Sequence, residues 1–143
     1  MNWLNRYADP VYCIVRLVIG LMFACHGGQK ILGFPPGGRP AANALGWSAG
    51  GIELAGGFLI AVGLHTRLAA FIASGEMAVA YFMTSFSGTT LDHAPTALER
   101  LLPILNYGEV PVLLCFVFFF IIFYGPGRWS VDALIRLKST SSP

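Results

Sequence analysis

The chain has 143 residues, of which 55% are hydrophobic and 11% are charged, and its formal net charge at pH 7 is +2. A soluble domain usually has about a quarter of its residues charged, so this composition excludes an ordinary soluble globular fold. The small net charge also argues against a nucleic-acid partner. The length fits one domain, and apolar runs of about twenty residues place that domain in a membrane.

The first apolar run, residues 11–33, is long enough to cross a bilayer as one helix. It carries three ionisable side chains, Arg16, His26 and Lys30. Such groups are expensive in hydrocarbon and tend to face a bundle interior or water. We therefore expect a helix over about residues 11–32 that needs polar partners elsewhere in the chain. Proline and glycine residues after it end the helix.

Two further helices are predicted from the next apolar runs. The second, about residues 46–64, is rich in glycine and contains Glu53. Small residues spaced four apart along it allow neighbouring helix backbones to approach closely. A short turn follows, so the third helix, about residues 68–86, should run antiparallel beside the second, and it carries Glu76.

The longest polar stretch, residues 87–103, is predicted to be a loop. A fourth helix over about residues 104–124 opens with Asn106 and Glu109 and is then almost purely apolar. Glycine and proline stop it, and a short amphipathic helix over about residues 131–138 should lie on the membrane interface. The expected fold class is all-α: a polytopic membrane protein with a bundle of four transmembrane helices, formed as a single domain by the whole chain.

Four spans place both termini on one side of the membrane. Basic side chains are concentrated on the cytoplasmic side of membrane proteins. On the terminal side the sequence has five of them: Arg6, Arg67, Arg128, Arg136 and Lys138. The opposite side has Arg39 and Arg100. We therefore expect a multi-pass protein of the bacterial inner membrane with cytoplasmic N- and C-termini.

The ionisable and polar residues of the spans are predicted to form one buried polar pocket. Its candidate residues are Arg16, His26, Lys30, Glu53, Glu76, Asn106 and Glu109. A rise of about 1.5 Å per residue places most of them in the outer half of the membrane, with Arg16 and Glu76 deeper. An ionised group at mid-bilayer costs about 3 kcal/mol, so acids and bases should face one another. Arg16 with Glu76 or Glu53, and Lys30 with Glu109, are pairs that the helices allow.

Each candidate also has a purely structural interpretation. Arg16 and Lys30 can extend their charges to opposite interfaces. Glu109 can simply occupy a helix N-terminus, where a carboxylate is favoured. His26 can be a helix-packing histidine. The two glutamates in the middle of helices are too deep to reach water, so they either hold the helices together or form a site.

Cysteine and histidine spacing gives no support to a metal or disulfide. Cys13, Cys25 and Cys115 lie in apolar runs and form no CxxC pair, so a structural disulfide is not expected. The histidine of the first span has no partner at metal-ligand spacing, and no metal site is expected. The sequence contains no nucleotide-binding loop or catalytic triad, so the catalytic residues are unknown and enzymatic activity stays open.

Four stretches together resemble the DoxX family: RLVIGLMFACHGGQKILGF, GGIELAGGFLIAVGLHTRLAA, NYGEVPVLL and GPGRWSVDALI. The resemblance covers about residues 15–134. The family's pattern is matched at Arg16, His26, Gly27, Lys30, Glu53, Gly56, Gly57, Arg67, Glu76, Asn106, Glu109, Gly125, Pro126, Gly127, Arg128 and Asp132. It implies a small membrane protein with four spanning helices, which agrees with the hydropathy.

The resemblance also implies a redox-associated role, because the family takes its name from a small subunit of a thiosulfate–quinone oxidoreductase. The first hypothesis is therefore a subunit of a quinone- or thiol-linked membrane redox complex, with quinone as the cofactor of its polar pocket. The alternative is a non-catalytic accessory subunit that packs on a larger membrane complex. A small-solute or proton-coupled transporter ranks third. The expected partners are membrane lipid and either other complex subunits or further copies of the chain.

Overall fold

The computed structural model of the protein describes residues 2–38 and 40–140, and its regular structure there is helical. The helices are α1 (Asn5–Leu32), α2 (Ala44–Val62), α3 (Thr66–Ala80), α4 (Ala97–Leu101), α5 (Glu109–Tyr124) and α6 (Val131–Thr140). A π-helical segment, Tyr81–Phe86, continues α3. Among the described residues, α1, α2 and the continuous stretch Thr66–Phe86 are long and apolar enough to cross a membrane. The predicted all-α polytopic membrane fold is confirmed.

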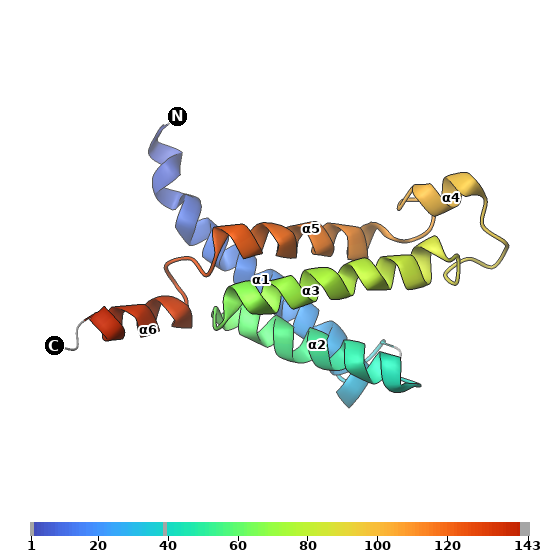
Figure 1. Cartoon of the computed structure of the whole chain (residues 1–143), viewed down its shortest axis with the longest axis horizontal. Coiled ribbons are helices and arrows are strands. Elements are labelled where there is room, and N and C mark those ends of the chain that lie inside the picture. Colours follow the sequence, from blue (N-terminus) through green and yellow to red (C-terminus); the bar gives the residue numbers. More distant parts are fainter. Residues whose placement is uncertain (1, 39, 141–143) are drawn as a thin grey trace.

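The four long helices form one bundle (Figure 1). α1 packs along α2, α2 lies beside α3, and α3 runs along α5. α5 also reaches α1, where the rings of Phe23 and Phe118 meet edge to face at 4.7 Å between centroids. Both termini, α6 and the α2–α3 turn lie at one end of the bundle, and α4 lies at the other. With 16 residues, α5 is about 24 Å long, shorter than a typical bilayer core of about 30 Å.

Two predicted helix starts are wrong. α1 begins at Asn5 rather than at residue 11 and continues through Pro10, although proline removes one helical hydrogen bond. α5 begins at Glu109 rather than at residue 104. The residues before it form turns because the Asn106 side chain donates to the Glu99 carbonyl at 2.8 Å and accepts from the Gly108 amide at 3.0 Å.

The predicted loop 87–103 contains one short helix that the prediction missed. α4 begins after Thr96, which forms a capping box with Glu99: the Glu99 carboxylate accepts from the Thr96 amide at 2.7 Å, and the Glu99 amide donates to the Thr96 hydroxyl. The T-x-x-E spacing of such a box is readable in the sequence. Arg39, which the topology prediction counted, and the last three residues of the predicted tail lie outside the described residues.

α1 and α2 approach closely because glycines line their contact. A Cβ atom added at Gly20 would lie 2.7 Å from the Gly57 carbonyl oxygen, and one added at Gly27 would lie 2.5 Å from the Gly50 carbonyl oxygen. These obstacles are backbone atoms, so a side chain there would push the helices apart. Of the predicted small-residue pairs of the second helix, Gly50 lies at this contact, together with Gly57, whereas Gly51 and Ala55 lie on the open side.

Replacing Gly57 by alanine should separate α1 from α2 and destabilise the protein by about 1–3 kcal/mol, because overpacking a tight contact is costly. The matched control is the neighbouring Gly56→Ala, where an added Cβ meets no atom within 4 Å. That variant should be neutral or slightly stabilised, since alanine favours a helix. Thermal unfolding in detergent micelles measures both. Equal midpoints for the two variants would contradict the packing described here.

Candidate functional site

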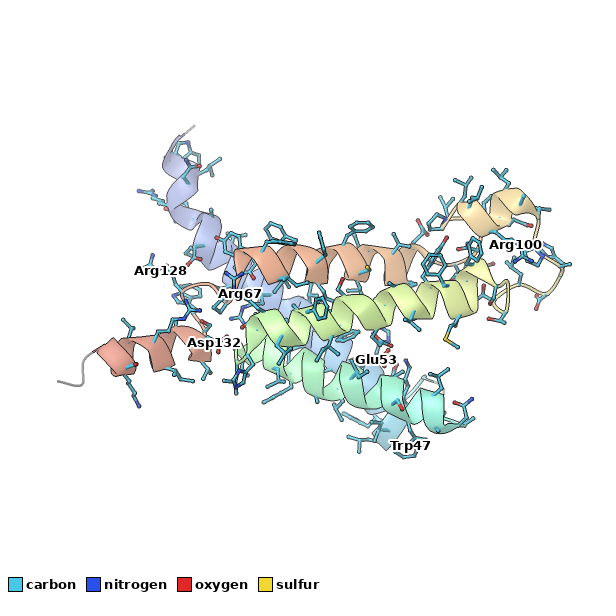
Figure 2. The ribbon with its side chains drawn as sticks, in the orientation of Figure 1. Trp47, Glu53, Arg67, Arg100, Arg128 and Asp132 are labelled. Atoms are coloured by element: carbon cyan, nitrogen blue, oxygen red, sulfur yellow. The ribbon has the colours of Figure 1, made fainter. Side chains whose placement is uncertain are left out.

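A partly buried ion pair joins α1 to α2 in the half of the bundle away from α6. Lys30 Nζ lies 2.5 Å from Glu53 Oε1. Glu53 is 3% exposed, whereas the Lys30 side chain keeps 34% of its surface accessible. Figure 2 shows Glu53 inside the bundle, in the half away from α6. Each of the two charges therefore has a partner of opposite sign, so neither is isolated in hydrocarbon.

Glu76 of α3 completes a group of three charged side chains. It lies within electrostatic reach of both Glu53 and Lys30. One carboxylate oxygen of Glu76 and one of Glu53 are buried without a hydrogen-bond partner. Buried polar atoms in native proteins are nearly always paired, so two unpaired oxygens beside one lysine indicate a place where a proton or a ligand donor is needed.

A groove of about 440 Å³ opens between α2 and α3 at this group. Lys30 and Glu76 lie in its lining. Its walls are mainly apolar and include Leu45, Ile52, Ile72, Val79 and Met83. Ligand sites typically combine apolar walls with a few polar groups that fix the orientation of the ligand. This groove has that composition.

Arg16 is fully buried at the other end and pairs with carbonyls rather than carboxylates. Nη1 donates to the Ile60 and Ala61 carbonyls, the second at 3.0 Å, and Nη2 donates to the Trp129 carbonyl at 2.7 Å. The last carbonyls of α2 carry the negative end of its dipole, so a guanidinium is favoured there, although the Ile60 carbonyl also accepts from the Gly63 amide at 3.2 Å. The predicted pairing of Arg16 with Glu53 or Glu76 is not formed.

The remaining candidates do not join the Lys30 group. His26 is exposed and lines a different shallow groove on α1, with Met22 and Cys25. It precedes Gly27, which faces α2, and one residue turns a helix by about 100°. Asn106 is buried but serves the turns before α5, as described above. Glu109 is exposed in the first turn of α5, and its predicted pair with Lys30 is replaced by the Lys30–Glu53 pair.

Comparison with known proteins identifies the family. The DoxX family model matches residues 11–85, which include Arg16 and the three charged residues Lys30, Glu53 and Glu76. A protein of Haemophilus influenzae is 36% identical over 92% of this chain and 96% of its own length. A Mycobacterium tuberculosis protein, named as an uncharacterized membrane protein, is 27% identical over 96% of this chain and 89% of its own length. No solved structure matches the chain.

The chain belongs to the DoxX family. Its groove charges and buried arginine all fall within the segment that the family model matches, whereas α5 and α6 lie beyond it. The described residues of this DoxX protein contain no cluster of three or more histidine, cysteine, aspartate or glutamate side chains that could hold a metal ion.

One important residue of this DoxX protein was underestimated from the sequence. Asp132 entered the sequence prediction as a position of the DoxX pattern, whereas its carboxylate caps α3. It accepts from the His65 amide at 2.9 Å, the Thr66 amide at 3.0 Å and the Thr66 hydroxyl at 3.0 Å. Burial raises the pKa of Asp132, but these hydrogen bonds outweigh burial and lower it. The absence of a good capping residue before Thr66 was the available signal.

Asp132→Ala should remove this cap and destabilise the protein by about 1–2 kcal/mol, the usual cost of losing a helix N-cap. The control is Asp92→Ala, which removes the same side chain from an exposed loop. Thermal unfolding of both variants in the same detergent provides the comparison. The cap would have no role in stability if Asp132→Ala melted at the temperature of Asp92→Ala.

The α4 cap should be sensitive to acid. Hydrogen bonds from the Thr96 amide and hydroxyl and from His93 lower the pKa of Glu99 from 4.5 to about 2. Because the folded pKa is depressed, the cap is fully present above pH 4.5 and weakens as the pH falls toward 2. The protection factor of the α4 amides, which corrects for the intrinsic pH dependence of exchange, should fall over that interval. In Glu99→Gln this protection factor should no longer change there; an unchanged acid dependence in the variant would refute the assignment.

Proposed function

We propose that this DoxX protein binds the head group of a quinone in the groove between α2 and α3. The observation that carries the proposal is the pairing of apolar walls with Lys30 and Glu76 in one groove. A quinone likewise combines a polar part, the two carbonyl acceptors on its flat ring, with an apolar tail. Lys30 Nζ can donate to one carbonyl, and the tail can extend between the walls into lipid.

The unpaired carboxylate oxygens support a second role for the site, which is proton transfer. A quinone becomes a quinol by taking up two electrons and two protons. Glu76 and Glu53 lie beside one lysine, so one of them can hold a proton and pass it to a quinone oxygen. The same carboxylate then takes up a proton from water and transfers it to the second quinone oxygen. The two electrons would come from a partner redox protein. On this proposal the chain is the quinone-binding and proton-exchanging subunit of a membrane redox complex.

The distribution of basic residues supports cytoplasmic termini in the inner membrane. α6, the N-terminal part of α1 and the α2–α3 turn lie at one end of the bundle (Figure 1). That end carries Arg67 and Arg128, which Figure 2 shows beside Asp132. By the positive-inside rule this end faces the cytoplasm, and the quinone groove lies toward the opposite side of the membrane.

A second candidate function is a non-catalytic subunit that docks through α5. Four phenylalanines of this helix are at least half exposed: Phe116, Phe119, Phe120 and Phe123. A partner helix or lipid tails can cover such a face. Copurification from gently solubilised membranes separates the candidates. A dedicated docking subunit would lose its partner when these phenylalanines become alanine and would be unaffected by changes in the groove.

Photolabelling tests the quinone proposal. The purified full chain in lipid nanodiscs is illuminated with an azido-benzoquinone, and the labelled residues are mapped by mass spectrometry. Labels should concentrate in residues 45–52 and 72–84 and be competed by decylubiquinone. Lys30→Met should reduce competed labelling about 10- to 100-fold, because a charged hydrogen bond contributes about 1.5–3 kcal/mol. Ala49→Phe should block the groove sterically.

Two matched variants control the photolabelling experiment. Ala55→Phe adds the same ring to an exposed position of α2, and Glu109→Gln removes a charge at an exposed helix end. Both should be labelled like the parent chain. Labelling spread evenly over the lipid-facing helices, or groove labelling that survives both Lys30→Met and Ala49→Phe, would refute quinone binding at this site.

A further inference from the structure

A second pocket, far from the quinone groove, lies where α6 meets the end of the bundle. It has a volume of about 760 Å³ and is lined by Arg67, Arg128 and Arg136 together with Asp9. Trp129 and Tyr124 also contribute to its lining. Neither the ion pair of Lys30 nor the carbonyl contacts of Arg16 involve these arginines. The pocket is therefore a separate feature that the proposed function does not use.

The three arginines outnumber the one carboxylate. Asp9 accepts from the Arg128 amide at 3.2 Å and from the Tyr124 hydroxyl at 3.4 Å, and it lies 3.9 Å from Arg128 Nε. Arg67 directs Nη1 to the Ile122 carbonyl at 2.7 Å. A guanidinium has five N–H donors, so both arginines have donors beyond these contacts. The formal charges of the residues that line this pocket sum to +2, and Asp132 lies in an adjoining groove that Arg67 and Arg136 also line. Arg67 and Arg128 keep N–H groups suited to phosphate oxygens.

The surroundings of the pocket identify it as interfacial. It lies at the end of the membrane-spanning helices, beside α6, whose exposed Leu134 and Leu137 alternate with basic residues. Trp129 is 60% exposed, and tryptophan is enriched at the level of lipid head groups. An amphipathic helix of this kind lies in the interface plane with its apolar side in the acyl chains.

We infer that this pocket, defined by Arg67, Arg128 and Arg136, binds the phosphate-bearing head group of an anionic membrane lipid. The lipid belongs to the leaflet on the side of the two termini, and its acyl chains follow α6 and the end of α5. Charge complementarity selects an anion, and the interfacial position selects a lipid rather than a soluble phosphate. Basic pockets between membrane helices are a recurring way to hold such head groups.

Native mass spectrometry of the full chain tests the inference. The protein is delipidated in detergent and titrated with phosphatidylglycerol or with phosphatidylcholine. Phosphatidylglycerol should bind more tightly, and the preference should weaken as ionic strength rises. The double variant Arg128→Gln/Arg136→Gln should lose about 30-fold in phosphatidylglycerol affinity, about fivefold for each basic residue near an anionic surface. Arg67 is left unchanged because it also contacts the end of α5.

The matched control is Arg6→Gln/Lys138→Gln, which removes two basic residues that do not line the pocket. It should retain most of the affinity for phosphatidylglycerol. Equal losses in the two double variants would mean diffuse charge attraction instead of a site, and would overturn the inference. So would an Arg128→Gln/Arg136→Gln variant that binds as tightly as the parent chain.

A substitution of Asp9 should change the lipid affinity in the opposite direction to the arginine substitutions. Asp9→Asn keeps the size of the side chain and its acceptor for Tyr124 but removes the negative charge in the pocket. This variant should bind phosphatidylglycerol about fivefold more tightly than the parent chain. Inorganic phosphate and glycerol 1-phosphate provide the soluble arm: millimolar amounts should leave the bound lipid in place. Displacement of the lipid by either one at lower concentration would assign the pocket to a soluble phosphate and overturn the lipid inference.

Discussion

The contact between Arg16 and the end of α2 is the interaction on which the architecture depends. A guanidinium inside a membrane bundle must have its N–H groups satisfied, and Arg16 satisfies most of them with the Ile60, Ala61 and Trp129 carbonyls. These three acceptors come from α2 and from the segment before α6, so one side chain of α1 fixes both. Asp132, in the first turn of the α6 helix that follows this segment, then caps α3. The end that holds the termini is therefore closed by hydrogen bonds between distant parts of the chain.

The buried charged side chains are of two kinds, which differ in what pairs with them. Arg16 is held by backbone groups that cannot change protonation, which suits a structural role. Lys30, Glu53 and Glu76 are held by one another, and each glutamate has a buried oxygen without a partner. Two carboxylates sharing one ammonium group cannot both be fully compensated, so this group has a polar requirement that the protein itself does not meet. Arg16 Nε is also buried without a partner, but only the Lys30 group combines unpaired acceptors with two titratable carboxylates, as expected at a binding or proton-transfer site.

The sequence predicted the helices, their order and the compensation of charge, because hydropathy and helix rise determine depth. Depth did not predict the partners: it allowed Arg16 to pair with Glu53 or Glu76, whereas Arg16 binds carbonyls and Glu76 lies near Lys30 and Glu53. A single sequence could not predict which neighbour each helix face contacts. His26 and Lys30 are four residues apart on one helix, yet only Lys30 reaches α2. The carbonyl acceptors of Arg16 could not be predicted either, because every residue has a backbone carbonyl and the sequence does not show which ones are available. The starts of α1 and α5 were wrong because side-chain contacts, such as those of Asn106, override the hydrophobic pattern.

The glycines of α2 explain why one side of that helix is closed and the other is open. Gly50 and Gly57 face α1, where an added Cβ would strike side-chain atoms of α1 at the first and backbone atoms of α1 at the second. Gly51 and Gly56 lie on the other side, where an added Cβ meets nothing within 4 Å and a second shallow groove runs beside α3. Close packing on the first side brings Lys30 to Glu53. The absence of side chains on the second leaves α2 and α3 loosely joined toward the membrane. A ligand of the charged group would therefore enter sideways from the lipid, between α2 and α3, and not along the bundle axis, which the Arg16 end closes.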